Sequence, residues 1–145
     1  MKISTKGRYS LRMLLDLAEH KDDGFIALKD IAERQGISKK YLEQIVTLLN
    51  RSDILRTNRG NQGGYMLARV PHQYTVGEVL RITEGSLNSV ACLEDDPNRC
   101  DRVSFCKTLS VWQGLDKVVA DYLDNITLQD ILDSYLSAGA DDYCI

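Results

Sequence analysis

The sequence has no apolar run approaching the roughly 18 residues that a membrane-spanning helix needs, so we expect no transmembrane segment. Its first residues lack the apolar core of about 7–15 residues found in signal peptides, which predicts a cytoplasmic location. It contains no internal repeat, no low-complexity tract and no phosphate-binding loop. It also lacks a recognisable pair of nucleophile and base. We therefore expect a cytoplasmic protein that is not an enzyme.

Charge is unevenly distributed along the 145 residues. Residues 1–70 carry 13 Lys/Arg against 8 Asp/Glu, whereas residues 71–145 carry 5 against 13. The basic half is the part that would approach a polyanion such as DNA. Charge alone is equally compatible with two solvated faces. The hydrophobic content of 43% and the charged content of 27% are those of an ordinary globular protein.

Helix signals dominate the first fifty residues. Apolar side chains recur every three or four positions from 5 to 21, which predicts a first helix. A short second helix begins near Leu28 and ends at Gly36, which can adopt the left-handed conformation that closes a helix. Ser38 is typical of the residue before a helix and predicts a third one. A short helix, a turn containing glycine and an amphipathic helix together form a helix-turn-helix.

A β-hairpin is predicted directly after the third helix. Two short extended runs, 55–59 and 65–67, flank the glycine-rich segment 60–64. Three glycines among five residues allow positive φ angles and the close approach of a partner backbone. A hairpin that follows a helix-turn-helix is a wing, and the combination is more specific than either part.

The second half of the chain is predicted to hold three more helices around an irregular segment. A threonine cap opens the first, at 75–84, and residues 85–105 follow without helix or strand periodicity. At 21 residues this stretch is too long for an idle connection in a small domain. A long helix over 107–125 and a last one over 127–136 complete the prediction.

The long helix carries an apolar seam that is wider than one small winged domain needs. We expect the seam to be buried against the same helix of a second subunit, with packing onto its own domain as the alternative. The predicted fold is therefore mainly α with a small β-wing. It consists of a winged helix-turn-helix domain at 1–84, a cysteine-bearing sensor loop at 85–106, and a dimerisation helix with a C-terminal helix at 107–145. The seam comprises Val111, Leu115, Val118 and Tyr122, widened by Trp112 and Val119.

The exposed face of the third helix is the candidate DNA-reading surface, because a recognition helix inserts its first turns into the major groove. Gln44 can form two hydrogen bonds with adenine, and Glu43 can accept one from cytosine. Arg59 at the hairpin tip is shaped to enter an A·T-rich minor groove. Each residue taken singly could equally be an ordinary solvent-facing one. The full candidate set is Ser38, Lys39, Lys40, Tyr41, Glu43, Gln44 and Arg59, of which the lysines and the serine suit phosphate contacts.

Three of the four cysteines lie in the irregular segment, as Cys92, Cys100 and Cys106. Clustered cysteines in a cytoplasmic chain indicate metal or redox chemistry rather than structural disulfides. Their thiolates prefer zinc, copper(I) or iron–sulfur clusters, and the gaps of seven and five residues are wider than those of zinc knuckles. Spacing alone leaves a cluster, zinc, redox thiols and inert buried cysteines open. Cys144 is predicted to be a spectator.

Three segments, 1–9, 37–44 and 59–65, resemble the IscR/CymR/NsrR/RirA family of bacterial winged-helix transcription regulators. The resemblance extends over nearly the whole chain, including 125–128. It implies a homodimer that reads a pseudo-palindromic DNA operator. It also implies that Glu43 and Gln44 contribute to base readout and that Arg59 makes the minor-groove contact.

The same resemblance implies an iron–sulfur cluster, [2Fe-2S] or [4Fe-4S], because cluster-bearing members carry three cysteines in this loop. The gaps here look more like those of RirA-type members than those of IscR-like members. The latter usually have two gaps of five residues and a histidine three positions after the last cysteine, where this chain has Leu109. The fourth ligand is left open, since His20 and His72 match no ligand position of the family.

Coordination of a cluster by the cysteines would order a loose loop and change the relative orientation of the two DNA-binding domains of the dimer. Binding or loss of the cluster would thereby change the affinity for the operator. The predicted function is a regulator, as a repressor, of iron–sulfur, iron or cysteine homeostasis. The nearest alternative is a cluster-free, CymR-like repressor of cysteine metabolism gated by a regulatory protein partner. An electron carrier or enzyme using the cluster, and a protein-interaction module, are alternatives from other classes.

Overall fold

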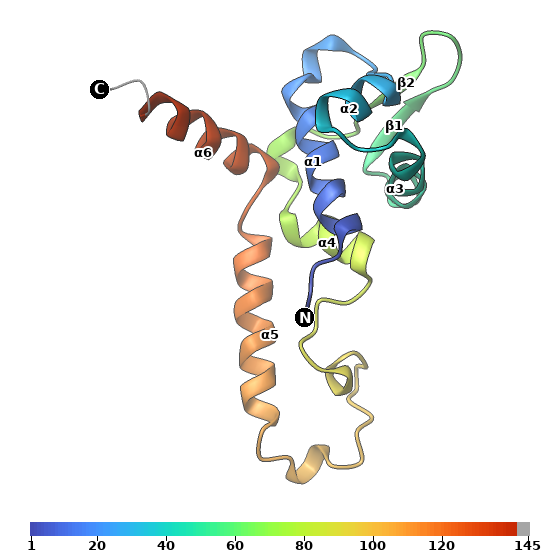
Figure 1. The fold of residues 1–145 in the computed structure, drawn as a ribbon. Coiled ribbons are helices and arrows are strands. Elements are labelled where there is room, and N and C mark those ends of the chain that lie inside the picture. Colours follow the sequence, from blue (N-terminus) through green and yellow to red (C-terminus); the bar gives the residue numbers. More distant parts are fainter. Residues whose placement is uncertain (142–145) are drawn as a thin grey trace.

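The computed structural model describes residues 1–141, so Cys144 lies outside the described part of the chain. Helices α1 to α4 and a hairpin gather into one head, whereas α5 stands beside this head as a separate column (Figure 1). The connection from α4 to α5 loops out beyond the end of the column, and α6 begins beside the head and points away from it. The elements are α1 Thr5–Glu19, α2 Leu28–Gln35, α3 Lys39–Arg51, β1 Leu55–Asn58, β2 Gly64–Leu67, α4 Val76–Glu84, α5 Leu109–Asp124 and α6 Leu128–Asp141.

Short side chains begin these helices as predicted. The Ser38 hydroxyl accepts a hydrogen bond from the backbone N–H of Tyr41 at 3.1 Å, and the Thr75 hydroxyl accepts one from Glu78 at 3.1 Å. Gly36 ends α2 in the left-handed conformation, with φ 62°. The predicted helix-turn-helix is therefore confirmed. The first helix is two residues shorter than predicted, because a 3-10 turn at Lys21–Asp23 follows it.

The core of the head is built from the inward faces of α1 to α4, together with the first residue of α6. Tyr74 is completely buried; its hydroxyl donates to the carbonyl of Ile54 at 2.8 Å and accepts from the backbone N–H of Arg69 at 2.8 Å. This one side chain joins the start of β1 to the segment after β2. The fully buried apolar residues around it include Met13, Leu14, Ile31, Leu42, Ile45, Leu49, Val79 and Leu128.

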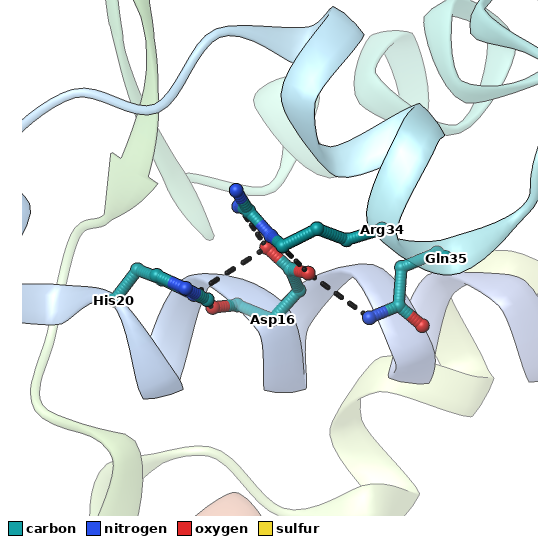
Figure 2. Close-up of polar contacts among 4 residues, drawn as sticks. All are labelled: Asp16, His20, Arg34 and Gln35. Carbon is teal, nitrogen blue, oxygen red and sulfur yellow. Dashed lines mark hydrogen bonds and ion pairs between the residues drawn. The ribbon is translucent and has the colours of Figure 1, made fainter.

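One carboxylate is buried within this head. The Asp16 side chain on α1 is 1% exposed and accepts two hydrogen bonds from Arg34, at 2.6 and 3.0 Å, and one from the Gln35 amide at 2.9 Å. Figure 2 shows Arg34 and Gln35 reaching from α2 to this carboxylate, with His20 on its other side. Burial alone would raise the pKa of Asp16, but the bonds from Arg34 and Gln35 outweigh it and hold the pKa below its ordinary value of 3.8.

The hairpin is the predicted wing. Its strands are antiparallel, with Leu55 opposite Leu67 and Thr57 opposite Tyr65. The segment just before α2 adds a third, very short partner, because Ile26 and Tyr65 exchange two backbone hydrogen bonds of 2.8 Å each. The wing is thereby tied to the helix-turn-helix by backbone as well as by sequence.

The C-terminal elements confirm the predicted long helix and extend the last one. Thr127 and Asp130 cap α6 reciprocally, at 2.8 and 3.1 Å, and the helix runs to Asp141 rather than 136. No residue of α5 is buried, and its seam residues Val118 and Tyr122 are each 66% exposed. Among the described residues, no helix is long and apolar enough to cross a membrane.

Replacing Asp16 with asparagine should lower the free energy of unfolding by about 1–3 kcal/mol at pH 7, because Arg34 loses its anionic partner. The estimate is below that for a fully buried pair, since the Arg34 side chain is 36% exposed and regains water. Because the pKa of Asp16 is lowered in the folded protein, the ionised carboxylate stabilises the fold at pH values above the ordinary pKa of 3.8. This stabilisation is lost as the pH falls through the pKa of the folded state. The difference between wild type and Asp16→Asn in denaturant titrations should therefore shrink as the pH is lowered to about 3.

The matched control is Asp22→Asn, which removes the same charge from an exposed position and should change stability by less than about 0.5 kcal/mol. A pH-independent gap between wild type and Asp16→Asn would contradict the assignment of this carboxylate.

Candidate nucleic-acid interface and cysteine loop

The outer face of α3 is free of the core. Ser38, Lys39, Lys40, Glu43 and Gln44 are all exposed, whereas Leu42, Ile45, Val46 and Leu49 are buried on the opposite side. The predicted reading residues on α3 thus share one solvent-facing surface, with one exception. That surface carries two lysines at the start of the helix and a carboxamide beside a carboxylate one turn later.

Tyr41 is the exception among the predicted reading residues. Its side chain is half-buried and packs edge-on against Tyr9 of α1, with ring centroids 5.6 Å apart. The guanidinium of Arg12 lies 5.1 Å from the centre of the Tyr9 ring. Tyr41 therefore anchors the first turn of α3 to α1, a role that helical spacing alone did not indicate.

Arg59 lies at the start of the wing tip and is exposed. Gly60 beside it has φ 120°, and the N–H of Gly63 closes the tip by donating to the Gly60 carbonyl at 3.0 Å. Only glycine adopts that φ without strain, which explains its place next to the predicted minor-groove arginine.

A groove between the recognition helix and the wing is lined by three of the predicted residues, whereas Ser38, Lys40, Tyr41 and Gln44 lie outside it. Lys39 and Glu43 line it from α3, and Arg59 lines it from the wing. Sequence reasoning missed Lys29, at the start of α2, which adds a second lysine to the floor. It also missed Asn50, which lies two turns after Glu43 on the same helix face. The signal was available in the spacing of seven residues, since such residues share a helix face.

The cysteine loop is irregular apart from two 3-10 turns, at Ala91–Leu93 and Val103–Phe105. Cys92, Cys100 and Cys106 are free thiols of intermediate exposure. The hydroxyl of Thr108 contacts the Cys106 sulfur at 3.6 Å and, with backbone N–H groups of Thr108 and Leu109, lowers the pKa of that thiol.

The loop is fastened to the helices at its beginning. The N–H of Ser89 donates to Asp116 of α5 at 2.7 Å, and the amide of Asn88 donates to the Leu93 carbonyl at 2.6 Å. Next to this joint, Arg81 of α4 forms two hydrogen bonds with Asp124 of α5, at 2.6 and 2.9 Å. These polar bonds contribute to the position of α5 beside the head.

The three thiols are suitable in kind for an iron–sulfur cluster, because thiolates are its protein ligands. Two buried polar atoms of the loop, the Ser89 hydroxyl and the Asn98 amide nitrogen, have no hydrogen-bond partner among the described residues. Such orphaned groups are common where a ligand completes a site. The conformation of the single chain, however, does not gather the donors: no three His, Cys, Asp or Glu side chains within residues 1–141 are close enough to hold a metal ion.

The chain is similar to known transcription regulators along almost its whole length. Residues 3–134 match the Rrf2 family, described as an iron-dependent transcriptional regulator. Protein rrf2 of Nitratidesulfovibrio vulgaris is 38% identical over 132 residues, which cover 91% of this chain and 87% of that protein. The structure of T. potens IscR is 40% identical with a TM-score of 0.76, covering 95% of this chain and 90% of that one. CymR, the global cysteine regulator of B. subtilis, is 37% identical with a TM-score of 0.75, covering 93% and 98%.

Replacing Gly64 with alanine should loosen the wing. A Cβ at this position would overlap with the carbonyl group of Ile26, which is backbone and cannot move aside without breaking its pairing with Tyr65. We expect the free energy of unfolding to fall by about 1–3 kcal/mol, as for other overpacked sites. Hydrogen exchange of the Ile26 and Tyr65 amides should become faster.

Gly139→Ala is the matched control, because a Cβ there meets no heavy atom within 4 Å. In the interior of α6 it should be neutral or stabilise by up to about 1 kcal/mol. Unchanged exchange at Ile26 and Tyr65 in Gly64→Ala would show that this contact does not hold the wing.

Proposed function

Because the chain belongs to the Rrf2 family of transcription regulators, we propose that it is a dimeric repressor whose affinity for DNA is set by an iron–sulfur cluster on its loop cysteines. Family members are DNA-binding regulators and not enzymes. The proposal divides the chain into a reading head at 1–84, a sensor loop at 85–106 and a dimerisation part at 107–145. Its place of action is the cytoplasm, where the operator DNA is accessible.

The observation that carries the DNA-binding proposal is the shared groove between α3 and the wing. Gln44 and Glu43 face solvent where base edges would lie in a major groove, and Arg59 projects from the wing towards the adjacent minor groove. Ser38, Lys39 and Lys40 at the start of α3 are placed for phosphates, which hold the helix in register. Tyr41 supports this surface from behind.

Dimerisation is supported by the exposed apolar seam of α5. Beside Val118 and Tyr122, an apolar hollow is lined by Met1, Ile3 and Leu80 of the head. Apolar side chains this exposed along one helix favour burial against a second copy. Two heads joined in this way would read the two halves of a pseudo-palindromic operator about 34 Å apart.

Sensing is assigned to Cys92, Cys100 and Cys106. A bound [2Fe-2S] or [4Fe-4S] cluster would supply a redox- and iron-sensitive centre whose thiolate bonds hold the loop in one conformation. Binding of a cluster would restrain the conformation of the loop that carries the three thiols. Because Ser89 is bonded to Asp116, a change in the loop is transmitted to α5 and to the spacing of the heads.

A cluster-free, CymR-like repressor of cysteine metabolism, gated by a protein partner, is the second candidate. It is favoured by the nearly equal similarity to CymR and IscR structures. In that case the cysteines would act as redox groups or as structural ones.

Base readout by Gln44 can be tested with a duplex enriched from a random-sequence library by the wild-type protein. Gln44→Ala should weaken binding to that duplex by about ten-fold or more, with little effect on an unrelated duplex. Lys40→Ala should weaken both equally and reduce the slope of log affinity against log salt by about one. A duplex with a single half-site should bind more weakly than the full site. Equal losses on both duplexes for Gln44→Ala would contradict base readout, and wild-type binding without salt dependence would contradict DNA binding itself.

Cluster binding can be tested by anaerobic reconstitution followed by visible absorption and analysis of iron and sulfide. The wild type should be coloured and bind the enriched duplex differently before and after loading. Alanine at Cys92, Cys100 or Cys106 should abolish the absorption, whereas Cys144→Ala should leave it intact. A colourless wild type would favour the CymR-like alternative, and equal affinities of loaded and cluster-free protein would refute sensing.

A further inference from the structure

The wing has two attachments to the rest of the head near its tip, one on each strand. On β2, Tyr65 exchanges backbone hydrogen bonds with Ile26. On β1, the hydroxyl of Thr57 donates to the Oδ1 atom of Asn50 on α3 at 3.1 Å. Thr57 and Tyr65 are opposite one another in the hairpin, so the two attachments act at the same level. Beyond these two attachments, the hairpin contains only one more residue pair, Asn58 and Gly64, and the tip.

The attachment on β1 connects the recognition helix itself to the wing. In the described part of the chain, it is the one side-chain hydrogen bond between α3 and the hairpin. Asn50 follows Glu43 by two turns on the same face, and Thr57 precedes Arg59 by two residues in the sequence. All four line the groove between helix and wing. The bond therefore joins the two walls of the groove that Glu43 and Arg59 also line.

We propose that Asn50 and Thr57 are positioning residues that hold the wing at a set distance from the recognition helix, and so determine the sequence preference beneath Arg59. This inference rests on the proposed DNA-binding function. A recognition helix in the major groove and a wing in the next minor groove enclose one strand of the backbone between them. The arginine discriminates A·T from G·C pairs by the narrowness of the minor groove, and displacement of about 1 Å is enough to weaken such a contact.

The test compares Thr57→Val, which keeps the shape and the strand preference but removes the donor, with Thr57→Ser, which keeps the donor. The probe is the duplex enriched by wild-type protein, together with versions in which A·T pairs are replaced by G·C. The pairs to replace are those at which Arg59→Ala loses its preference. Thr57→Val should reduce the preference for A·T at these pairs by about three- to ten-fold, as expected for one lost hydrogen bond. Thr57→Ser should retain it, and the preference that depends on Gln44 should persist in both.

Coupling distinguishes positioning from a general structural role. In an Arg59→Ala background, Thr57→Val should have no further effect on affinity, and Asn50→Ala combined with Thr57→Val should be no worse than either alone. Asn50→Ala also provides a second variant that folds readily, since alanine suits an exposed helix position. An unchanged A·T preference in Thr57→Val, or an equal loss with and without Arg59, would overturn the inference. If the wild type enriches no duplex, the proposed function fails instead.

Discussion

The buried carboxylate of Asp16 is the contact on which the reading head depends. Arg34 and Gln35, the last two residues before the turn of the helix-turn-helix, bind it from α2. An unpaired charge at this depth would be strongly unfavourable, so α2 is held in the one position that supplies both partners. Gly36 and Ser38 then set the direction of α3 relative to α2. The orientation of the reading surface thus follows from an ion pair that does not itself face DNA.

The side-chain hydrogen bonds that attach α5 and the cysteine loop are more exposed than those of the Asp16 cluster. Arg81 and Asp124 are each more than 40% exposed, and the bond from Ser89 to Asp116 connects a loop to a helix without buried residues. Solvent and salt weaken such pairs far more than they weaken the Asp16 cluster. The molecule therefore combines a rigid head with an adjustable column. This is the distribution of stability that a regulator needs if ligand binding is to move the heads without disturbing the surfaces that read DNA.

Local patterns were sufficient to predict most of the head. The cap at Ser38, the left-handed Gly36 and the glycine-rich wing depend on neighbouring residues, and all three are in the structure as expected. Asp16 and Arg34 were not predicted, because 18 residues separate them and a polar residue on an amphipathic helix is normally solvated. Tyr41, which packs against Tyr9 of α1, is a similar case. Helical spacing shows which residues are exposed on an isolated helix, but not which of them a second element will cover.

The loop cysteines show the opposite limit of sequence reasoning. Their spacing and the family resemblance concern what the residues can bind, whereas a single chain without a ligand leaves the thiols apart. Thiolates repel one another, and the loop contributes few apolar contacts that could draw them together. In the proposed function, the three thiols would be brought together by the ligand, by the second subunit, or by both. The seam of α5 is similar, since Val111, Leu115, Val118 and Tyr122 remain exposed in the described chain. The head has its own buried core within one polypeptide, whereas α5 has no buried residue and the cysteine loop is irregular. In the proposed function, these parts would be ordered by the ligand and the second subunit that they bind.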